Sequence, residues 1–217
     1  MVNWIILKLK AIPNLLQRIP FTLLTLAGLF IAALVTNTTF QNITHNWLNR
    51  TGFAPNDLWY GNIERMFSSA LVTSGGIVFW EALFFLIFAV GLAEWITGWK
   101  RTAATFWGVH LLALILLSLI ISLGMHQLRD FGLEASEVVR DVGPSAGYFA
   151  CLGLVSAQLK RPWNWISGGL LFAMFVIMPF MPAAAGENAQ IKFSADMAHM
   201  LAFPLGWFSS LIGSKRL

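Results

Sequence analysis

The chain has 217 residues, of which 57% are hydrophobic and only 11% are charged, and its mean hydropathy is +0.69. A soluble domain carries about 25% charged residues, so this composition excludes an ordinary soluble enzyme and a disordered protein. The single cysteine excludes a disulfide scaffold. A net charge of +4 would be compatible with binding to nucleic acid. The basic residues, however, stand in pairs between apolar runs, as in the loops of membrane proteins, so we expect no nucleic-acid binding.

Apolar runs recur along the chain, and a helix that spans a bilayer needs about 20 such residues. We therefore predict an all-α membrane protein with one domain at residues 20–213. It is preceded by a basic segment at 1–19, which we expect to form a short helix on the membrane surface, and followed by a tail at 214–217. The six predicted spans are residues 20–36, 67–95, 103–123, 143–158, 163–182 and 195–212.

Basic and acidic residues alternate between successive loops. Basic pairs follow the second, fourth and sixth predicted spans, and three further basic residues precede the first span, whereas nearly all acidic residues fall in the opposite loops. Because Lys and Arg accumulate in cytoplasmic loops, this bias predicts that both termini are cytoplasmic. We expect a multi-pass protein of the bacterial inner membrane, with the lipid bilayer as its immediate partner.

Two polar residues within apolar spans suggest chemistry. Ser145 opens the fourth predicted span and His199 lies near the outer end of the sixth, so both are at similar depth. Stripes of Ala and Gly along these two spans would let their backbones come close. A serine beside a histidine base is a nucleophile. The alternative also stays open: the serine bonds its own backbone and the histidine bonds a neighbouring helix.

For other ionisable residues within the predicted spans we consider structural roles, such as hydrogen bonds between helices and helix caps. We expect His110 to bond a neighbouring helix and Glu94 to form a structural hydrogen bond or ion pair. Asp196 either orients the histidine three residues later or, as Ser194 could, caps the sixth span. Glu81 either supplies a polar group near the serine or bonds another helix. No grouping of His, Cys, Asp and Glu has the spacing of metal ligands, and no cofactor motif is present, so we expect neither a metal nor a cofactor.

Four short motifs resemble those of the rhomboid family of intramembrane serine proteases. GPSAGYFACLG at residues 143–153 is similar to the fourth-helix motif, and ADMAHMLAFPLG at 195–206 to the sixth-helix motif. ERMFS at 64–68 and GLAEWITG at 91–98 resemble the two ends of the second helix. Their order and spacing cover most of the chain, and six spans with cytoplasmic termini match the minimal rhomboid core.

The resemblance implies hydrolysis of a peptide bond within or beside the transmembrane helix of a single-span membrane protein. Ser145 would be the nucleophile and His199 the base of a Ser–His dyad. Gly143 would support the nucleophile, and Phe149 stands where rhomboids usually have a Tyr packed on the histidine. Arg65 keeps the arginine of a motif in the first loop.

The chain also departs from the family. Val78 and Ala82 stand where rhomboids carry a His and an Asn that help to bind the oxyanion, and neither can donate a hydrogen bond. Thr73 replaces another histidine, and Glu64 replaces a tryptophan. These departures keep a second function open: a catalytically weak or inactive rhomboid-like protein that binds transmembrane helices or is a subunit of a membrane complex.

Overall fold

The computed structural model describes residues 16–129, 140–183 and 188–212, with the backbone alone at 123–129. The structure is 77% helical, and the described part of the chain contains no strand. Most of the expected surface helix at residues 1–19 and the whole tail at 214–217 lie outside the described residues. The all-α prediction is therefore confirmed for the part that the structure describes.

The long helices match most of the predicted spans. They are α2 (Pro20–Thr36), α5 (Ile77–Phe85) continued by η3 (Leu86–Val90) and α6 (Gly91–Thr97), α7 (Trp99–Arg129), α8 (Ser145–Gln158), α9 (Trp163–Ile177) continued by η4 (Met178–Phe180), and α10 (Ala189–Ser209). Among the described residues, three helical stretches are long and apolar enough to cross a membrane: Ile77–Thr97, Trp99–Ser122 and Trp163–Phe180. Six spans and cytoplasmic termini stay predictions.

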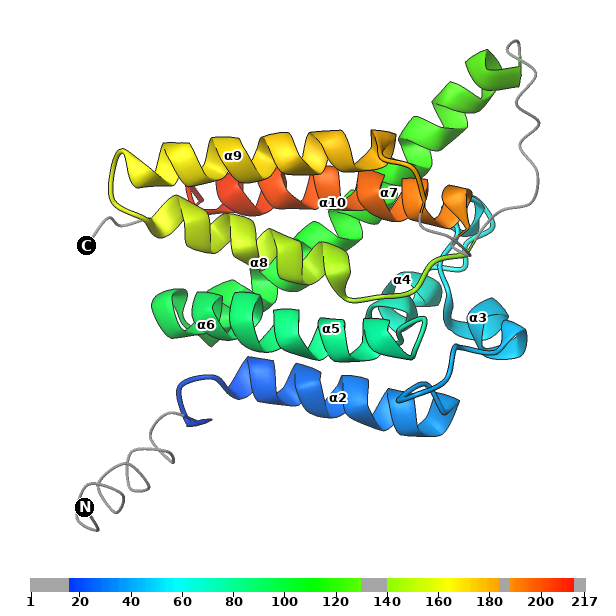
Figure 1. The fold of residues 1–217 in the computed structure, drawn as a ribbon, viewed down its shortest axis with the longest axis horizontal. Coiled ribbons are helices and arrows are strands. Elements are labelled where there is room, and N and C mark those ends of the chain that lie inside the picture. Colours follow the sequence, from blue (N-terminus) through cyan, green and yellow to red (C-terminus); the bar gives the residue numbers. More distant parts are fainter. Residues whose placement is uncertain (1–15, 130–139, 184–187, 213–217) are drawn as a thin grey trace.

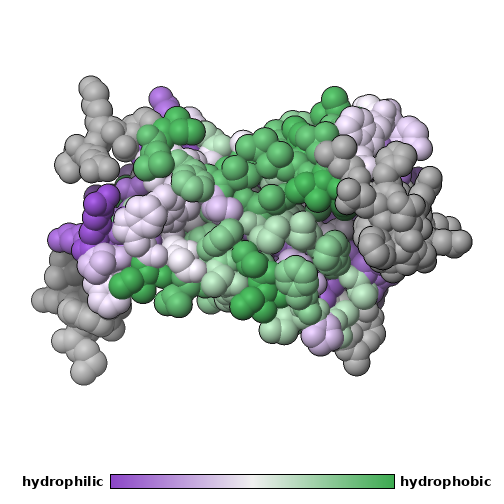
Figure 2. Space-filling model, turned by 90° about the horizontal axis from the view of Figure 1, so that it is seen from above, coloured by the Kyte–Doolittle hydropathy of each residue, from purple (hydrophilic) through white to green (hydrophobic). Residues whose placement is uncertain are grey.

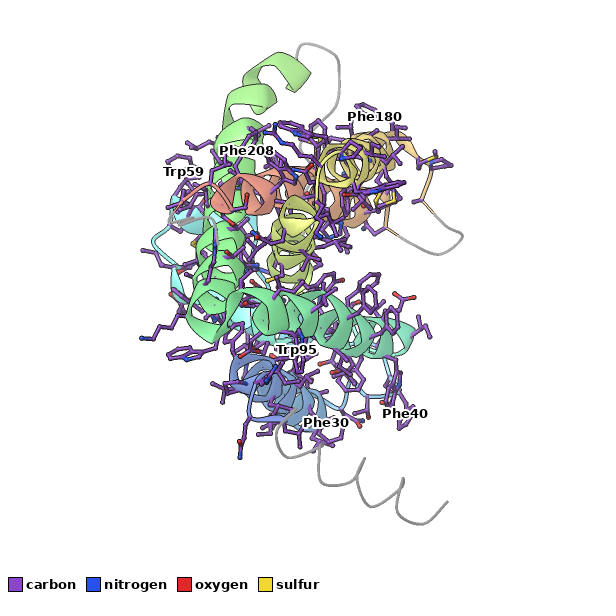
Figure 3. The ribbon with its side chains drawn as sticks, turned by 90° about the vertical axis from the view of Figure 1, so that its left-hand side faces the viewer. Phe30, Phe40, Trp59, Trp95, Phe180 and Phe208 are labelled. Atoms are coloured by element: carbon purple, nitrogen blue, oxygen red, sulfur yellow. The ribbon has the colours of Figure 1, made fainter. Side chains whose placement is uncertain are left out.

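The long helices lie side by side, with α7 crossing behind them (Figure 1). At one end α6 gives way to α7, α8 gives way to α9, and α10 ends; we call this the basic end because Lys100, Arg101, Lys160 and Arg161 lie there. Hydrophobic side chains cover the middle of the face in Figure 2, with hydrophilic ones gathered toward its ends. Aromatic rings such as Phe30 and Phe180 project outward from the bundle (Figure 3). This surface suits a hydrocarbon surrounding.

The predicted start of the second span was wrong. Residues 67–76 hold the end of α4 (Glu64–Ser68), η2 (Ser69–Leu71) and a turn, and the long helix begins only at Ile77. Gly75 and Gly76 have φ angles of 90° and 57°, and a Cβ on Gly75 would lie 2.0 Å from the carbonyl oxygen of Gln41. Only glycine adopts this backbone beside another chain segment without strain, so the helix cannot extend back through it.

The basic end is held together by Glu94 of α6. Its carboxylate accepts hydrogen bonds from the backbone N–H groups of Phe21 and Thr22 and from the Thr22 hydroxyl, at 2.7 to 2.8 Å. No side chain of α2 itself caps that helix. A buried carboxylate therefore satisfies the free amides at the start of α2 and favours its helix dipole, which confirms the structural role expected of Glu94.

The closest helix contact joins α8 to α10. A Cβ on Gly153 would lie 2.2 Å from the carbonyl oxygen of Phe203, and one on Gly206 would lie 2.0 Å from the carbonyl oxygen of Ala150. The two backbones therefore touch at positions that carry no side chain. The predicted small-residue contact between these helices is confirmed, and it brings the start of α8 alongside the first half of α10.

We expect Gly206→Ala to destabilise the protein by about 1–3 kcal/mol, because backbone atoms rather than a movable side chain occupy the space of the new methyl group. The free energy of unfolding in detergent, measured by circular dichroism, tests this. Gly108→Ala on α7 is the matched control, since its Cβ meets nothing within 4 Å. Equal stability of the two variants would contradict the close contact.

Candidate active site

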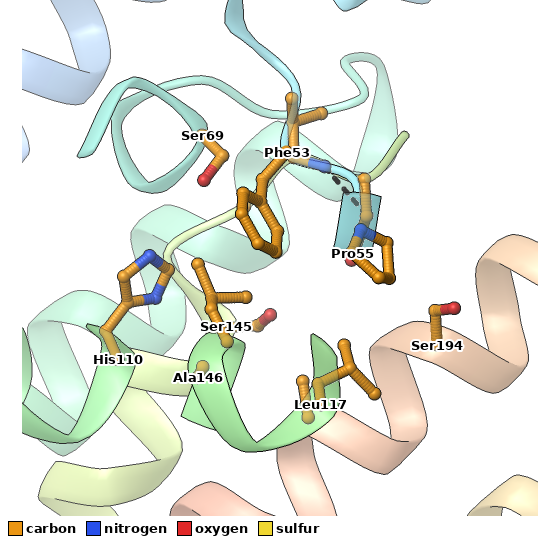
Figure 4. Close-up of a pocket in the computed structure, with 13 residues that line it drawn as sticks. Phe53, Pro55, Ser69, His110, Leu117, Ser145, Ala146 and Ser194 are labelled. Atoms are coloured by element: carbon orange, nitrogen blue, oxygen red, sulfur yellow. Dashed lines mark hydrogen bonds between the residues drawn. The ribbon is translucent and has the colours of Figure 1, made fainter. Parts of the chain in front are cut away.

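A small cavity of about 30 Å³ lies where α8 begins (Figure 4). Its walls come from the segment around Phe53, from α7, from the chain leading into α8, and from α10. Ser145 and Ser194 are among the lining residues, and the Ser145 side chain points into the space beneath Phe53. A cavity of this size has room for about one or two water molecules.

Ser145 is the first residue of α8, so its position is set by the turn that starts the helix. Gly143, two residues earlier, has a φ of 150° and donates its N–H to the carbonyl oxygen of Ser69 at 2.8 Å. No side chain caps α8, and Pro144 has no N–H. The amides of the first turn have no carbonyl within the helix to bond, and the helix dipole favours negative charge near them.

His199 of α10 packs against the ring of Phe149, which lies one turn after Ser145 on α8. The two ring centroids are 4.7 Å apart at an interplanar angle of 66°. Phe149 also contacts Phe85 of α5 and Phe175 of α9. The predicted packing of Phe149 on the histidine is therefore present. Residues of α5 and α9 pack around this ring of α8, which in turn contacts the imidazole.

Neither Ser145 nor His199 forms a hydrogen bond within the described residues, so the two are not bonded to each other in this structure. Both ring nitrogens of His199 are buried without a hydrogen-bond partner. In a free enzyme, catalytic hydrogen bonds are often long and form only when substrate binds. The site therefore has a hydroxyl that faces a cavity and, on the neighbouring helix, an imidazole that forms no hydrogen bond within the described residues.

Asp196 does not cap α10, so that alternative is wrong, and so is the one for Ser194. The helix begins at Ala189, and its cap is Asn188, whose side chain accepts from the N–H groups of Gln190 and Ile191 at 2.9 and 3.2 Å. Asp196 instead forms an ion pair with Lys192 and lies 3.7 Å from Nδ1 of His199. That distance is too long for a hydrogen bond, although the carboxylate is on the side of the imidazole.

The other histidine at membrane depth is structural. His110 of α7 is buried, and its Nε2 lies 2.9 Å from the carbonyl oxygen of Met66 in α4. This bond joins α7 to α4 and confirms the interhelical role expected of His110. His110 also lines the cavity, so it contributes to its wall while one ring nitrogen is already engaged.

The remaining candidates from the sequence lie apart from the cavity lining. Arg65 faces Asp57, with Nη1 3.5 Å from the carboxylate. Val78 is 40% exposed and Ala82 is buried, so the two second-helix positions present only apolar groups. Glu81 is exposed on α5, which does not favour it as a substitute donor in the cavity.

Asp57 anchors residues 52–58, here called the covering segment, whose Phe53 and Pro55 line the cavity. It is 2% exposed, and it accepts hydrogen bonds from Arg140, from Asn62 and from the N–H of Ala54. Burial alone would raise the pKa of Asp57, but these hydrogen bonds, together with the charge of Arg140, outweigh burial and hold the pKa below its ordinary value. Arg140 also donates to the carbonyl oxygen of Gly52, so one arginine joins the covering segment to the chain leading into α8.

Asp141 lines the cavity with Ser145, and the sequence reasoning did not single it out. Its backbone N–H and C=O exchange two hydrogen bonds of 2.9 Å with Phe53. Burial raises the pKa of the Asp141 carboxyl to about 6, although a charge on His199 would lower it. An acidic residue four positions before Ser145 was the available signal, but its place in the cavity wall could not be predicted, because its backbone pairs with a segment distant along the chain.

No family model matches the chain, and no curated protein or solved structure matches it either. The resemblance to rhomboid proteases therefore rests on the four sequence motifs alone.

We expect Asp57→Asn to destabilise the protein by about 1–3 kcal/mol at neutral pH, because the buried hydrogen bonds to Arg140 lose their anionic partner. A depressed pKa in the folded state contributes stability above the unfolded-state pKa near 3.8. This contribution is lost as the pH falls through the lower folded-state pKa, so the two proteins should converge in acid. Thermal unfolding from pH 3 to pH 8 measures this, with exposed Glu64→Gln as the control; an unchanged difference at all pH values would contradict the argument.

Proposed function

We propose that this protein is a rhomboid-type intramembrane serine protease in which Ser145 is the nucleophile and His199 the general base. In this proposal the chain crosses the membrane six times with both termini in the cytoplasm. It cleaves single-span membrane proteins near the outer face of the membrane.

The observation that carries the proposal is that neither buried ring nitrogen of His199 forms a hydrogen bond within the described residues, with the Asp196 carboxylate 3.7 Å from Nδ1. Buried polar groups in folded proteins are almost always hydrogen-bonded, so a buried histidine without a partner requires an explanation. His110 shows how this fold treats a structural histidine, because it bonds the carbonyl oxygen of Met66. His199 has no such bond within the described residues, yet Phe149 holds its ring beside the helix that begins with Ser145. A histidine whose ring nitrogens are kept free to accept a proton during catalysis explains this contrast.

The chemistry would follow the usual two steps of acyl transfer. Ser145 Oγ attacks the scissile carbonyl carbon while its proton passes to His199, and the imidazolium then protonates the leaving amine as the C–N bond breaks. Water attacks the resulting ester and gives a proton to His199. That proton returns to Ser145 Oγ when the C–O bond breaks and the new carboxyl end leaves.

Backbone amides are the available donors for the oxyanion. Val78 and Ala82 offer no hydrogen bond, and loss of one such donor typically reduces turnover by about 10²–10³-fold. The N–H of Ser145 and the next amides of α8 lie where the helix dipole favours an anion. We therefore expect a slow enzyme that relies on the start of α8 for transition-state stabilisation.

The proposal predicts that Ser145→Ala and His199→Ala each abolish cleavage of a single-span substrate in liposomes. Both side chains carry the proton-transfer and bond-forming steps, so the loss should reach the detection limit. Peptide products are measured by mass spectrometry, and thermal unfolding checks that the variants fold. A serine-directed fluorophosphonate should label Ser145 in the native sequence.

Ser194→Ala is the matched control, because Ser194 of α10 lines the same cavity but is not paired with a general base in the proposed mechanism. It should keep its activity. Cleavage that persists in both Ser145→Ala and His199→Ala would remove the dyad from consideration.

A groove between α9 and α10 favours a second candidate function, binding of transmembrane helices without cleavage. It has a volume of about 410 Å³ and a mostly apolar, aromatic lining: Trp165, Gly168, Gly169, Phe172, Phe203, Pro204, Trp207 and Phe208. Small residues let a helix approach closely in lipid. A groove of this kind fits a partner helix that itself carries small residues.

Gly169→Leu tests this second candidate, since the new side chain has open space at its Cβ and would fill the groove without disturbing the fold. Binding of a fluorescently labelled single-span peptide in liposomes should weaken at least tenfold. Gly108→Leu, which is equally open on α7, is the control and should leave binding unchanged. Equal binding by both variants would exclude the groove as the binding surface.

A further inference from the structure

We propose that Asp196 is a positioning residue of the Ser145–His199 site: its carboxylate holds the imidazole of His199 with the proton on Nδ1, so that Nε2 is the nitrogen that accepts the serine proton. This inference rests on the proposed function. It adds to the dyad a third side chain, which the fold holds in place through Lys192.

The two oxygens of the Asp196 carboxylate face different partners. Oδ2 pairs with the ammonium group of Lys192, one turn earlier on α10, and Oδ1 lies 3.7 Å from Nδ1 of His199, three residues later. Residues at spacings of three and four share one face of a helix, so the three side chains follow one another along α10. The carboxylate therefore lies between a cation and the imidazole, with one oxygen toward each.

Lys192 is itself anchored, which fixes the direction of the carboxylate. Its ammonium group donates a further hydrogen bond, of 2.8 Å, to the carbonyl oxygen of Met178 in η4. The side chains of Lys192 and Asp196 are only 17% and 6% exposed. Because the cost of removing two charges from water offsets most of their attraction, such a pair adds little stability by itself. Stability alone therefore does not account for its place beside His199.

The ring of Phe149 confines the imidazole on another side, with the two ring centroids 4.7 Å apart. A carboxylate near Nδ1 favours the tautomer that carries its proton there, because the N–H dipole then points at a negative charge. A shift of about 0.8 Å would bring Oδ1 of Asp196 to hydrogen-bond distance from Nδ1. Catalytic contacts often shorten in this way when substrate binds.

The same tautomer leaves the other ring nitrogen of His199 ready for catalysis. Nε2 is buried and has no hydrogen-bond partner within the described residues, so its lone pair is available to the proton of Ser145. An imidazole that carried its proton on Nε2 could not act as the base. The position of Asp196 therefore decides which nitrogen of the ring can do so.

Asp196→Asn should reverse the tautomer, because Lys192 selects the orientation of the new amide. An ammonium group only donates, so it attracts the amide oxygen and turns the amide NH₂ toward His199. Nδ1 then accepts from this NH₂, and the imidazole proton moves to Nε2. Nitrogen NMR of histidine-labelled protein in micelles measures the tautomer in alkaline solution, where imidazole is neutral. We expect the Nδ1–H form in the native sequence and the Nε2–H form in the variant, with His199→Gln to assign the signals.

The same substitution should reduce kcat for a single-span substrate by about 10²–10⁴-fold with KM unchanged, since Asp196 acts on the histidine and not on the substrate. Asp196→Glu keeps the charge and should restore the Nδ1–H form and part of the turnover. Lys192→Met is the matched control. It breaks the same ion pair and should lower the melting temperature, but it leaves the carboxylate beside Nδ1. It should therefore retain the Nδ1–H form and most of the turnover.

Three outcomes would count against these claims, and they can be told apart. If Asp196→Asn keeps the Nδ1–H form and the native kcat, the inference is overturned while the dyad stands. If Lys192→Met keeps the Nδ1–H form but loses kcat as severely as Asp196→Asn, the ion pair and not the tautomer limits turnover, and the inference is again overturned. If the native sequence neither cleaves nor reacts with a fluorophosphonate at Ser145, the proposed function itself fails, and the catalytic role of Asp196 fails with it.

Discussion

The backbone contact between α8 and α10 is the constraint on which the candidate site depends. At Gly153 and Gly206 the two helices approach so closely that even a methyl group would overlap a carbonyl oxygen. Such an approach fixes how far each helix can slide or turn along the other. It therefore sets the level at which Phe149 meets His199, and with it the distance of Ser145, one turn earlier on the same helix, from the imidazole.

The sequence predicted helix positions well where neighbouring residues along the chain determine them. The range 20–36 agrees with α2 because an apolar run begins at Pro20, which is favoured at a helix start. The sequence also marked Glu94 as a hydrogen-bonding residue. Its partners, the amides of Phe21 and Thr22, are more than 70 residues away and could not be read from any pattern. The start of the second span was missed because Gly75 lies against Gln41, again a contact distant along the chain.

The candidate site divides in the same way. Ser145, His199 and Phe149 were found because they sit in motifs with helical spacing. Asp141 was missed because an acid before a helix is ordinarily solvent-exposed, and its backbone pairs with Phe53, 88 residues earlier in the numbering. Acidic residues acquire their roles from what packs over them, so a charge pattern alone predicted their side of the membrane but not their chemistry.

The proposed chemistry has two opposing needs, since hydrolysis requires water and electrostatic stabilisation requires its exclusion. Placement of the serine at the first residue of α8, rather than in its middle, satisfies both. The cavity beneath Phe53 is large enough for a water molecule, while the ring of Phe149 shields the imidazole on the side of the bundle. Asp57 and Arg140 attach the segment that carries Phe53 and Pro55 of the cavity wall, so the shape of the site depends on the same polar contacts that stabilise this part of the fold.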